Sequence, residues 1–154
     1  MQIKIISIGR KMRPWEKESI DYYLKQLPNN FNIDFVYIAG LQHPKSSKKE
    51  IIEKESKLLI EKIYKDDYVV AWDSYGEQIN SETLTNFLSK KFEINKSISF
   101  LVGGSHGLSD EIKKKSHKVY SASLLTFPHR LFRVILVEQI YRAHTIMTVS
   151  YTHL

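Results

Sequence analysis

Residues 98–111 read Ile98-Ser99-Phe100-Leu101-Val102-Gly103-Gly104-Ser105-His106-Gly107-Leu108-Ser109-Asp110-Glu111. The first five residues are mostly apolar, which predicts a buried strand that ends at the paired glycines. A serine followed by two acidic residues predicts the N-terminus of a short helix. A strand, a glycine-rich loop and a helix in this order are typical of an α/β protein.

Predicted strands and helices also alternate on both sides of this stretch. β-Branched and aromatic segments predict further strands at residues 2–8, 31–38, 68–72 and 119–121. Apolar stripes at helical spacing predict helices at residues 14–27, 48–63, 81–88 and 128–144, the second of them behind the capping box Ser47-Lys48-Lys49-Glu50. Five strands alternating with five helices predict a single α/β domain over residues 1–154, with a mainly parallel sheet flanked by helices.

The composition narrows the class of protein. With 42% hydrophobic and 26% charged residues, the chain is typical of a globular protein. The absence of cysteine excludes disulfides and thiolate metal sites, and no two of the six histidines are spaced i, i+4, so we expect no metal. The net charge of +6 favours a polyanionic partner. No targeting segment or membrane-length apolar run is present, so we expect a cytoplasmic protein with no membrane contact.

Two loops follow predicted strands and are candidates for ligand binding. Ligands of α/β sheets bind beyond the carboxyl ends of strands, and the glycines of residues 103–107 allow close approach of a ligand. The alternative is a tight turn that needs positive φ angles. The loop lacks the Gly-Lys-Ser/Thr of a phosphate-binding loop. In the second loop, Trp72-Asp73-Ser74-Tyr75-Gly76, Asp73 either holds a ribose hydroxyl or shapes the turn.

A third candidate region spans residues 121–142. The predicted helix is apolar almost all round between Leu131 and Val137, so it is buried on more than one side, and a second subunit is expected to cover part of it. His129 and Arg133 lie four residues apart and share one face. Arg142 has the same spacing from Glu138, which is equally consistent with a helix-stabilising pair. His129 is a candidate for chemistry, for a helix cap or for a core histidine.

Three segments together resemble one family. They are Gly103-Gly104-Ser105-His106-Gly107-Leu108, then Leu125-Thr126-Phe127-Pro128-His129, then Arg133-Val134-Ile135-Leu136-Val137-Glu138-Gln139-Ile140-Tyr141-Arg142-Ala143. They are similar to the motifs of the ribosomal RNA large-subunit methyltransferase H family, which belongs to the SPOUT class. The length and the loop at residues 73–76 also fit, so the resemblance covers the whole chain.

The resemblance implies a SPOUT-type fold with a C-terminal trefoil knot and a homodimer that acts on the ribosome. It also implies transfer of a methyl group from S-adenosyl-L-methionine to N3 of a pseudouridine in large-subunit (23S) ribosomal RNA. The cofactor-binding residues that it assigns by position are Trp72, Gly103, Ala122, Ser123, Leu124, Leu125, Thr126 and Phe127.

The chemistry of that reaction indicates which residues to consider as catalytic. The cofactor's methyl group is already electrophilic, so the protein mainly supplies alignment. The proton on N3 must leave around the transfer, and histidine suits proton removal, whereas arginine suits stabilising the developing charge or binding phosphate. The candidates are His129, Arg133, Arg142 and His153, and the sequence does not assign one role to one residue.

The chain departs from the family in two places. The family usually has leucine where Trp72 stands, and it ends in Tyr-His followed by Arg or Lys, whereas this chain ends Tyr151-Thr152-His153-Leu154. The family tail reaches into the partner's site, which leaves an alternative function: a ribosome- or RNA-binding module of SPOUT fold with impaired catalysis. A dinucleotide-binding enzyme is a third reading, and the single glycine of the first strand-to-helix turn, Gly9, counts against it.

Overall fold

The fold is an α/β sandwich with one parallel sheet. The computed structural model describes residues 1–40, 45–104 and 106–152. Along the chain the elements are β1 (Gln2–Ile8), α1 (Pro14–Leu24), β2 (Asn32–Ile38), α2 (Lys48–Glu61), β3 (Tyr68–Gln78), α3 (Ser81–Glu93), β4 (Ile98–Val102), α4 (Asp110–Lys115), β5 (Lys118–Ser121) and α5 (His129–Thr152). The strand order is β2-β1-β4-β3-β5, and every neighbouring pair is parallel. The predicted fold class is therefore confirmed, whereas the trefoil knot stays a prediction.

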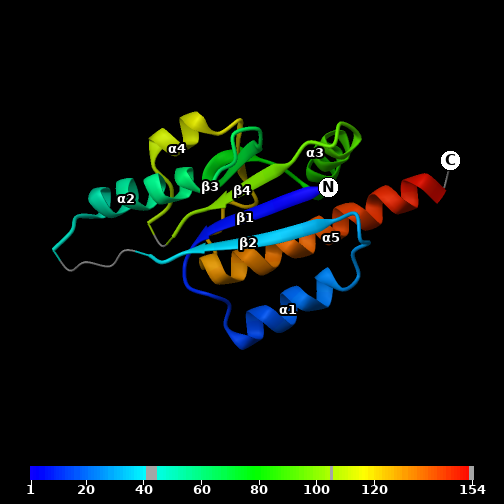
Figure 1. Cartoon of the computed structure of the whole chain (residues 1–154), viewed down its shortest axis with the longest axis horizontal. Helices are drawn as coiled ribbons and strands as arrows, with labels where there is room; N and C mark the ends of the chain where they lie inside the picture. Colours follow the sequence, from blue (N-terminus) through cyan, green and yellow to red (C-terminus); the bar gives the residue numbers. More distant parts are fainter. Residues whose placement is uncertain (41–44, 105, 153–154) are drawn as a thin grey trace.

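Helices cover both faces of the sheet. Figure 1 shows α2 and α4 on one face and α1 and α5 on the other. A cluster of apolar side chains from β1, β4, α1, α3 and α5 fills the second face, and a smaller cluster from β1, α2 and α4 fills the first. Leu136 of α5 is 1% exposed and belongs to the larger cluster, so it is a core residue of the single chain.

Serine and asparagine caps set the starts of three helices. The hydroxyl groups of Ser47 and Ser109 accept hydrogen bonds from backbone N–H groups of the first turns of α2 and α4, as the sequence predicts. The helix predicted from residue 81 is capped by the residue before it, because the side chain of Asn80 accepts a hydrogen bond from the Thr83 backbone N–H. Ser81 instead donates to Gln139 of α5 at 2.6 Å and so ties α3 to α5.

Two elements are longer than predicted. β3 does not end in a turn at residues 73–76: Glu77 and Gln78 pair again with Tyr120 and Ser121 of β5 after a register shift that follows Trp72. α5 continues from residue 144 to Thr152, and its last turns project beyond the sheet (Figure 1). The predicted catalytic residue His153 lies outside the described residues.

Candidate functional site

The carboxyl ends of β3 and β4 open into a cleft of about 870 Å³. In a parallel sheet all strands end at one edge, so the loops that follow them meet there. The cleft is lined by the end of β4, the bulged part of β3, the glycine loop after β4, residues 121–128 and the first turn of α5. Seven of the eight predicted cofactor residues line it, namely Trp72, Gly103, Ala122, Ser123, Leu125, Thr126 and Phe127.

The eighth predicted cofactor residue, Leu124, does not line the cleft. Its side chain is 80% exposed, and that of its neighbour Leu125 is 71% exposed. Phe127 and Leu131 are also exposed, so four large apolar side chains reach the surface within eight residues of chain. Exposed apolar side chains that lie close together on a surface can mark an interaction site.

The glycines after β4 form a tight turn that also borders the cleft. The Gly107 N–H donates to the Gly104 carbonyl at 3.1 Å, and Gly107 has a φ of +84°. A Cβ on Gly103 would lie 2.9 Å from the Gly107 backbone carbon and oxygen. A side chain at Gly103 would therefore displace the loop itself. The tight turn with a positive φ is present, and ligand binding by the same loop stays a prediction.

Asp73 shapes the bulge of β3. Its carboxylate accepts a hydrogen bond from the Tyr75 backbone N–H at 3.1 Å and forms an ion pair with Lys113 at 3.3 Å. Asp73 thus shapes the local backbone as expected, but within a bulged strand rather than in a turn, and the same side chain also lines the cleft. Its charge is already paired by Lys113, which anchors α4 against β3.

Trp72 separates the cleft from a second cavity of about 300 Å³ that lies between α3 and α5. The indole packs against Phe100, Tyr120 and Phe132, with ring centroids 5.6 to 5.9 Å apart. Its Nε1 is buried and has no hydrogen-bond partner among the described residues. A buried donor without an acceptor is costly, so this N–H is a candidate to bind a polar atom of a ligand.

His129 is the predicted catalytic residue that borders the cleft. It is the first residue of α5, and its ring packs on the backbone of Gly9, where a Cβ would approach Nε2 to 2.8 Å. Gly9 has a φ of +142°, so both its conformation and the contact favour glycine. Burial lowers the pKa of His129, and the positive charges of Arg133 and Arg130 lower this pKa further. The imidazole is therefore neutral at pH 7 and able to accept a proton.

Arg133 is fully buried one turn further along α5. It forms an ion pair with Glu16 of α1 at 3.0 Å, and both side chains are 0% exposed. The guanidinium also reaches the Arg10 carbonyl at 3.4 Å and lies 4.9 Å from the centre of the Tyr37 ring. Arg133 does not line the cleft. It therefore has a different environment from His129, although the two residues share one face of the helix.

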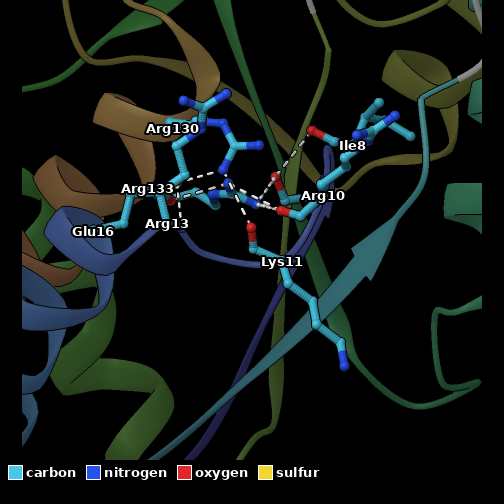
Figure 2. A network of polar contacts seen from close by, with 8 residues as sticks. Ile8, Arg10, Lys11, Arg13, Glu16, Arg130 and Arg133 are labelled. Atoms are coloured by element: carbon cyan, nitrogen blue, oxygen red, sulfur yellow. Dashed lines mark hydrogen bonds and ion pairs between the residues drawn. The ribbon is translucent and has the colours of Figure 1, made fainter.

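Glu16 is the residue that sequence reasoning missed. Figure 2 shows Arg130 and Arg133 converging on the start of α1, where Glu16 accepts from Arg130 at 2.6 Å and from the Arg13 backbone N–H at 3.2 Å. The cost of burying the Glu16 carboxylate is offset because each of its oxygens accepts a hydrogen bond. In the sequence, Glu16 is the third residue of a helix that begins at Pro14. This position indicates a helix start, but it does not indicate a partner more than a hundred residues away.

Arg142 lies away from the cleft. It is exposed on α5 and forms a hydrogen-bonded ion pair with Glu138 at 2.6 Å, which raises the pKa of its guanidinium. The helix rise places it about 20 Å along the axis from His129. Within one chain the structure therefore brings His129 to the predicted cofactor residues but does not bring Arg142 to them.

The described residues hold no cluster of three or more acidic or histidine side chains that could bind a metal ion. In the same part of the chain, no helix combines the length and apolar character of a membrane span.

Comparison with known proteins agrees with this arrangement. Residues 1–153 match a family model described as "Predicted SPOUT methyltransferase". The crystal structure of a methylase-family protein from Neisseria gonorrhoeae superposes with a TM-score of 0.54 at 12% identity, over 92% of this chain and 82% of that one, which supports the fold alone.

Curated relatives match over nearly their whole length. The ribosomal RNA large subunit methyltransferases H of Coxiella burnetii and Clostridium perfringens are each 38% identical to this chain and cover 96% of both sequences. That of Caldicellulosiruptor saccharolyticus is 37% identical over 94% of this chain and 95% of its own. The chain therefore belongs to the ribosomal RNA large subunit methyltransferase H family of SPOUT methyltransferases.

Proposed function

We propose that this protein transfers a methyl group from S-adenosyl-L-methionine to N3 of a pseudouridine in large-subunit ribosomal RNA. The observation that carries the proposal is the cleft at the carboxyl ends of β3 and β4, which gathers seven predicted cofactor residues and His129. The relatives that span nearly the whole chain bear the name of a ribosomal RNA large subunit methyltransferase, which supports the substrate class. A ribosomal substrate implies that the protein acts in the cytoplasm.

The cleft suits S-adenosyl-L-methionine in size and chemistry. Its volume lies within the range of small-molecule sites, and aromatic rings of Trp72, Phe127 and Phe132 border it. Aromatic faces attract cations such as a sulfonium. The bound cofactor would supply an electrophilic methyl group, while Trp72, Gly103 and residues 122–127 would hold and orient it.

In this proposal His129 accepts the N3 proton. A neutral imidazole is needed for that role, and burial together with the adjacent arginines keeps the pKa of His129 below its ordinary value. Arg133 is a positioning residue in this proposal. Its ion pair with Glu16 holds the first turn of α5 against α1, and its side chain does not line the cleft. Arg142 and His153 keep a role only where a second subunit brings them to the cleft, as the resemblance implies for the tail.

We also propose that the active form is a homodimer. Leu124, Leu125, Phe127 and Leu131 expose apolar area beside the cleft, and the loop that carries three of them also supplies predicted cofactor residues. A partner subunit that covers this area would at the same time close the cofactor side of the cleft. The dimer and the cofactor site are then built on the same segment.

Transfer of a radiolabelled methyl group to ribosomes that lack this modification tests the proposal. We expect label on one pseudouridine of large-subunit RNA, and we expect His129→Gln to lower the rate with little effect on cofactor binding measured by calorimetry. The matched control is His117→Gln, since His117 directly precedes β5, does not line the cleft, and accepts at Nδ1 from the Val69 backbone N–H. Ribosomes that are bound but remain unlabelled would instead favour the binding-module function.

A further inference from the structure

The loop between β1 and α1 carries a dense group of positive charges. Arg10, Lys11 and Arg13 lie within four residues, and all three are exposed. Among the residues that the structure describes, none of these three side chains forms an ion pair. The cations of the neighbouring elements differ in this respect, because Lys113, Arg130 and Arg133 are each paired with a carboxylate.

The backbone of this loop is held in place at several points. The Arg10 carbonyl accepts from Arg133 at 3.4 Å, and the Lys11 carbonyl accepts from Arg130 at 3.2 Å. The Arg13 N–H donates to Glu16 at 3.2 Å. In Figure 2 the side chain of Lys11 points away from this network. A fixed backbone with outward charges loses little conformational freedom when it binds a polyanion.

The loop also adjoins the candidate catalytic residue. Gly9, directly before Arg10, packs against the ring of His129, which borders the cleft on its other side. A nucleotide whose base reaches His129 must carry its own phosphate groups past the neighbouring surface. The three cations stand at that surface.

We propose that Arg10, Lys11 and Arg13 bind backbone phosphates of the RNA that flank the target nucleotide. This inference rests on the proposed function, since RNA is the polyanion that the methylation reaction would bring to the cleft. Lysine and arginine contacts to phosphate release counterions, so each contact steepens the decrease of affinity with salt. The loop thereby positions the RNA, whereas the cleft selects the base.

Binding to ribosomes at several KCl concentrations, measured by co-sedimentation, tests the inference. The variant is Arg10→Gln/Lys11→Gln/Arg13→Gln. The matched control is Lys57→Gln/Lys65→Gln/Lys96→Gln, which removes the same charge from residues that do not line the cleft; Lys65 and Lys96 precede β3 and β4 at the opposite sheet edge. We expect the loop variant to lose about two to three units of the slope of log affinity against log salt, and at least about tenfold in affinity at low salt.

The control should keep the slope of the unmodified protein, and both variants should keep their thermal stability and their affinity for S-adenosyl-L-methionine. If the loop variant does not fold, Lys11→Gln alone should still lower the slope by about one unit. Equal losses in both triple variants, or an unchanged slope in the loop variant, would overturn the inference. A protein that binds ribosomes in this way but never methylates them would contradict the proposed function alone.

Discussion

On one side of the cleft the first turn of α5 is tied to the β1–α1 loop by the buried pair Glu16 and Arg133 and by the partly buried Arg130. On the other side residues 122–128 expose large apolar side chains. On the first side both carboxylate oxygens of Glu16 have donors within a single chain, and Arg133 Nε is the one buried nitrogen of the network without a partner among the described residues. The second side has exposed apolar area at Leu124, Leu125 and Phe127, which the proposed cofactor and second subunit would cover. We therefore expect the proposed proton acceptor to be held in place before binding, and the proposed cofactor site to be completed by binding.

Removing the centre of the bonded side should have the largest effect. Glu16→Ala leaves two arginines without their carboxylate, one of them fully buried, and we expect the free energy of unfolding to decrease by roughly 3–5 kcal/mol. Urea denaturation measures it. Asp21→Ala on the same helix removes an exposed pair with Lys17 and should cost less than about 1 kcal/mol. Similar costs for the two variants would remove the contrast between the two sides.

A substitution on the side of the cleft with exposed apolar residues should weaken dimerisation rather than folding. Leu131→Asp places a charge on an exposed apolar position, and we expect the dimer to dissociate, with a dissociation constant raised about thirtyfold or more. Sedimentation velocity measures it, with Ile94→Asp as the control on another exposed apolar residue, which directly follows α3. Leu136→Lys, by contrast, should unfold the chain because Leu136 lies in the core. A monomeric unmodified protein would contradict this prediction.

Acid should weaken the bonded side through His129. Its pKa is lowered in the folded state, so below the ordinary value of 6.5 the unfolded chain binds a proton that the folded chain resists. The free energy of unfolding should therefore decrease as the pH falls from 7 through 6.5 toward the folded-state pKa. In His129→Gln this part of the decrease should disappear. Parallel stability curves for the two proteins between pH 7 and 5 would show that His129 is not coupled to the network.

The smallest effect is expected at Tyr37. Its ring faces Arg133, but its hydroxyl is buried without a hydrogen-bond partner among the described residues, and burial raises its pKa to about 12. Tyr37→Phe keeps the ring and removes the unsatisfied group, so stability should change by less than about 1 kcal/mol, in the stabilising direction. Tyr141→Phe, which loses a hydrogen bond to Gln26, should be neutral or slightly destabilising. Thermal unfolding compares them, and a clear destabilisation by Tyr37→Phe would reveal a partner for the hydroxyl.

Local patterns predicted the order of the strands and helices well, because apolar periodicity and serine caps such as Ser47 and Ser109 act over a few residues. The bulge of β3 was missed, since Asp73 and Gly76 have the chemistry of a turn and only pairing with β5 keeps the segment in the sheet. The eight additional residues of α5 were missed because its last turns lie beyond the sheet, where no stripe of buried residues marks them.

The candidate site could likewise be predicted from the sequence only in part. The predicted cofactor residues lie at or directly after the ends of predicted strands, so their gathering at one sheet edge follows from the parallel order. The burial of Arg133 does not follow from its spacing to His129, because it depends on Glu16, 117 residues away in sequence. Spacing on a helix face placed His129 and Arg133 together but could not show that His129 borders the cleft and that Arg133 is buried beside it.

The strand order has a consequence for synthesis on the ribosome. β4 lies between β1 and β3 in the sheet, yet it is translated after both of them. Until residues 98–102 emerge, β1 and β3 each expose an unpaired strand edge, and the nascent chain is at its most aggregation-prone. We therefore expect β1 and β3 to join into one sheet only after β4 is synthesised. The ion pairs of Glu16 with Arg130 and Arg133 of α5 form later still.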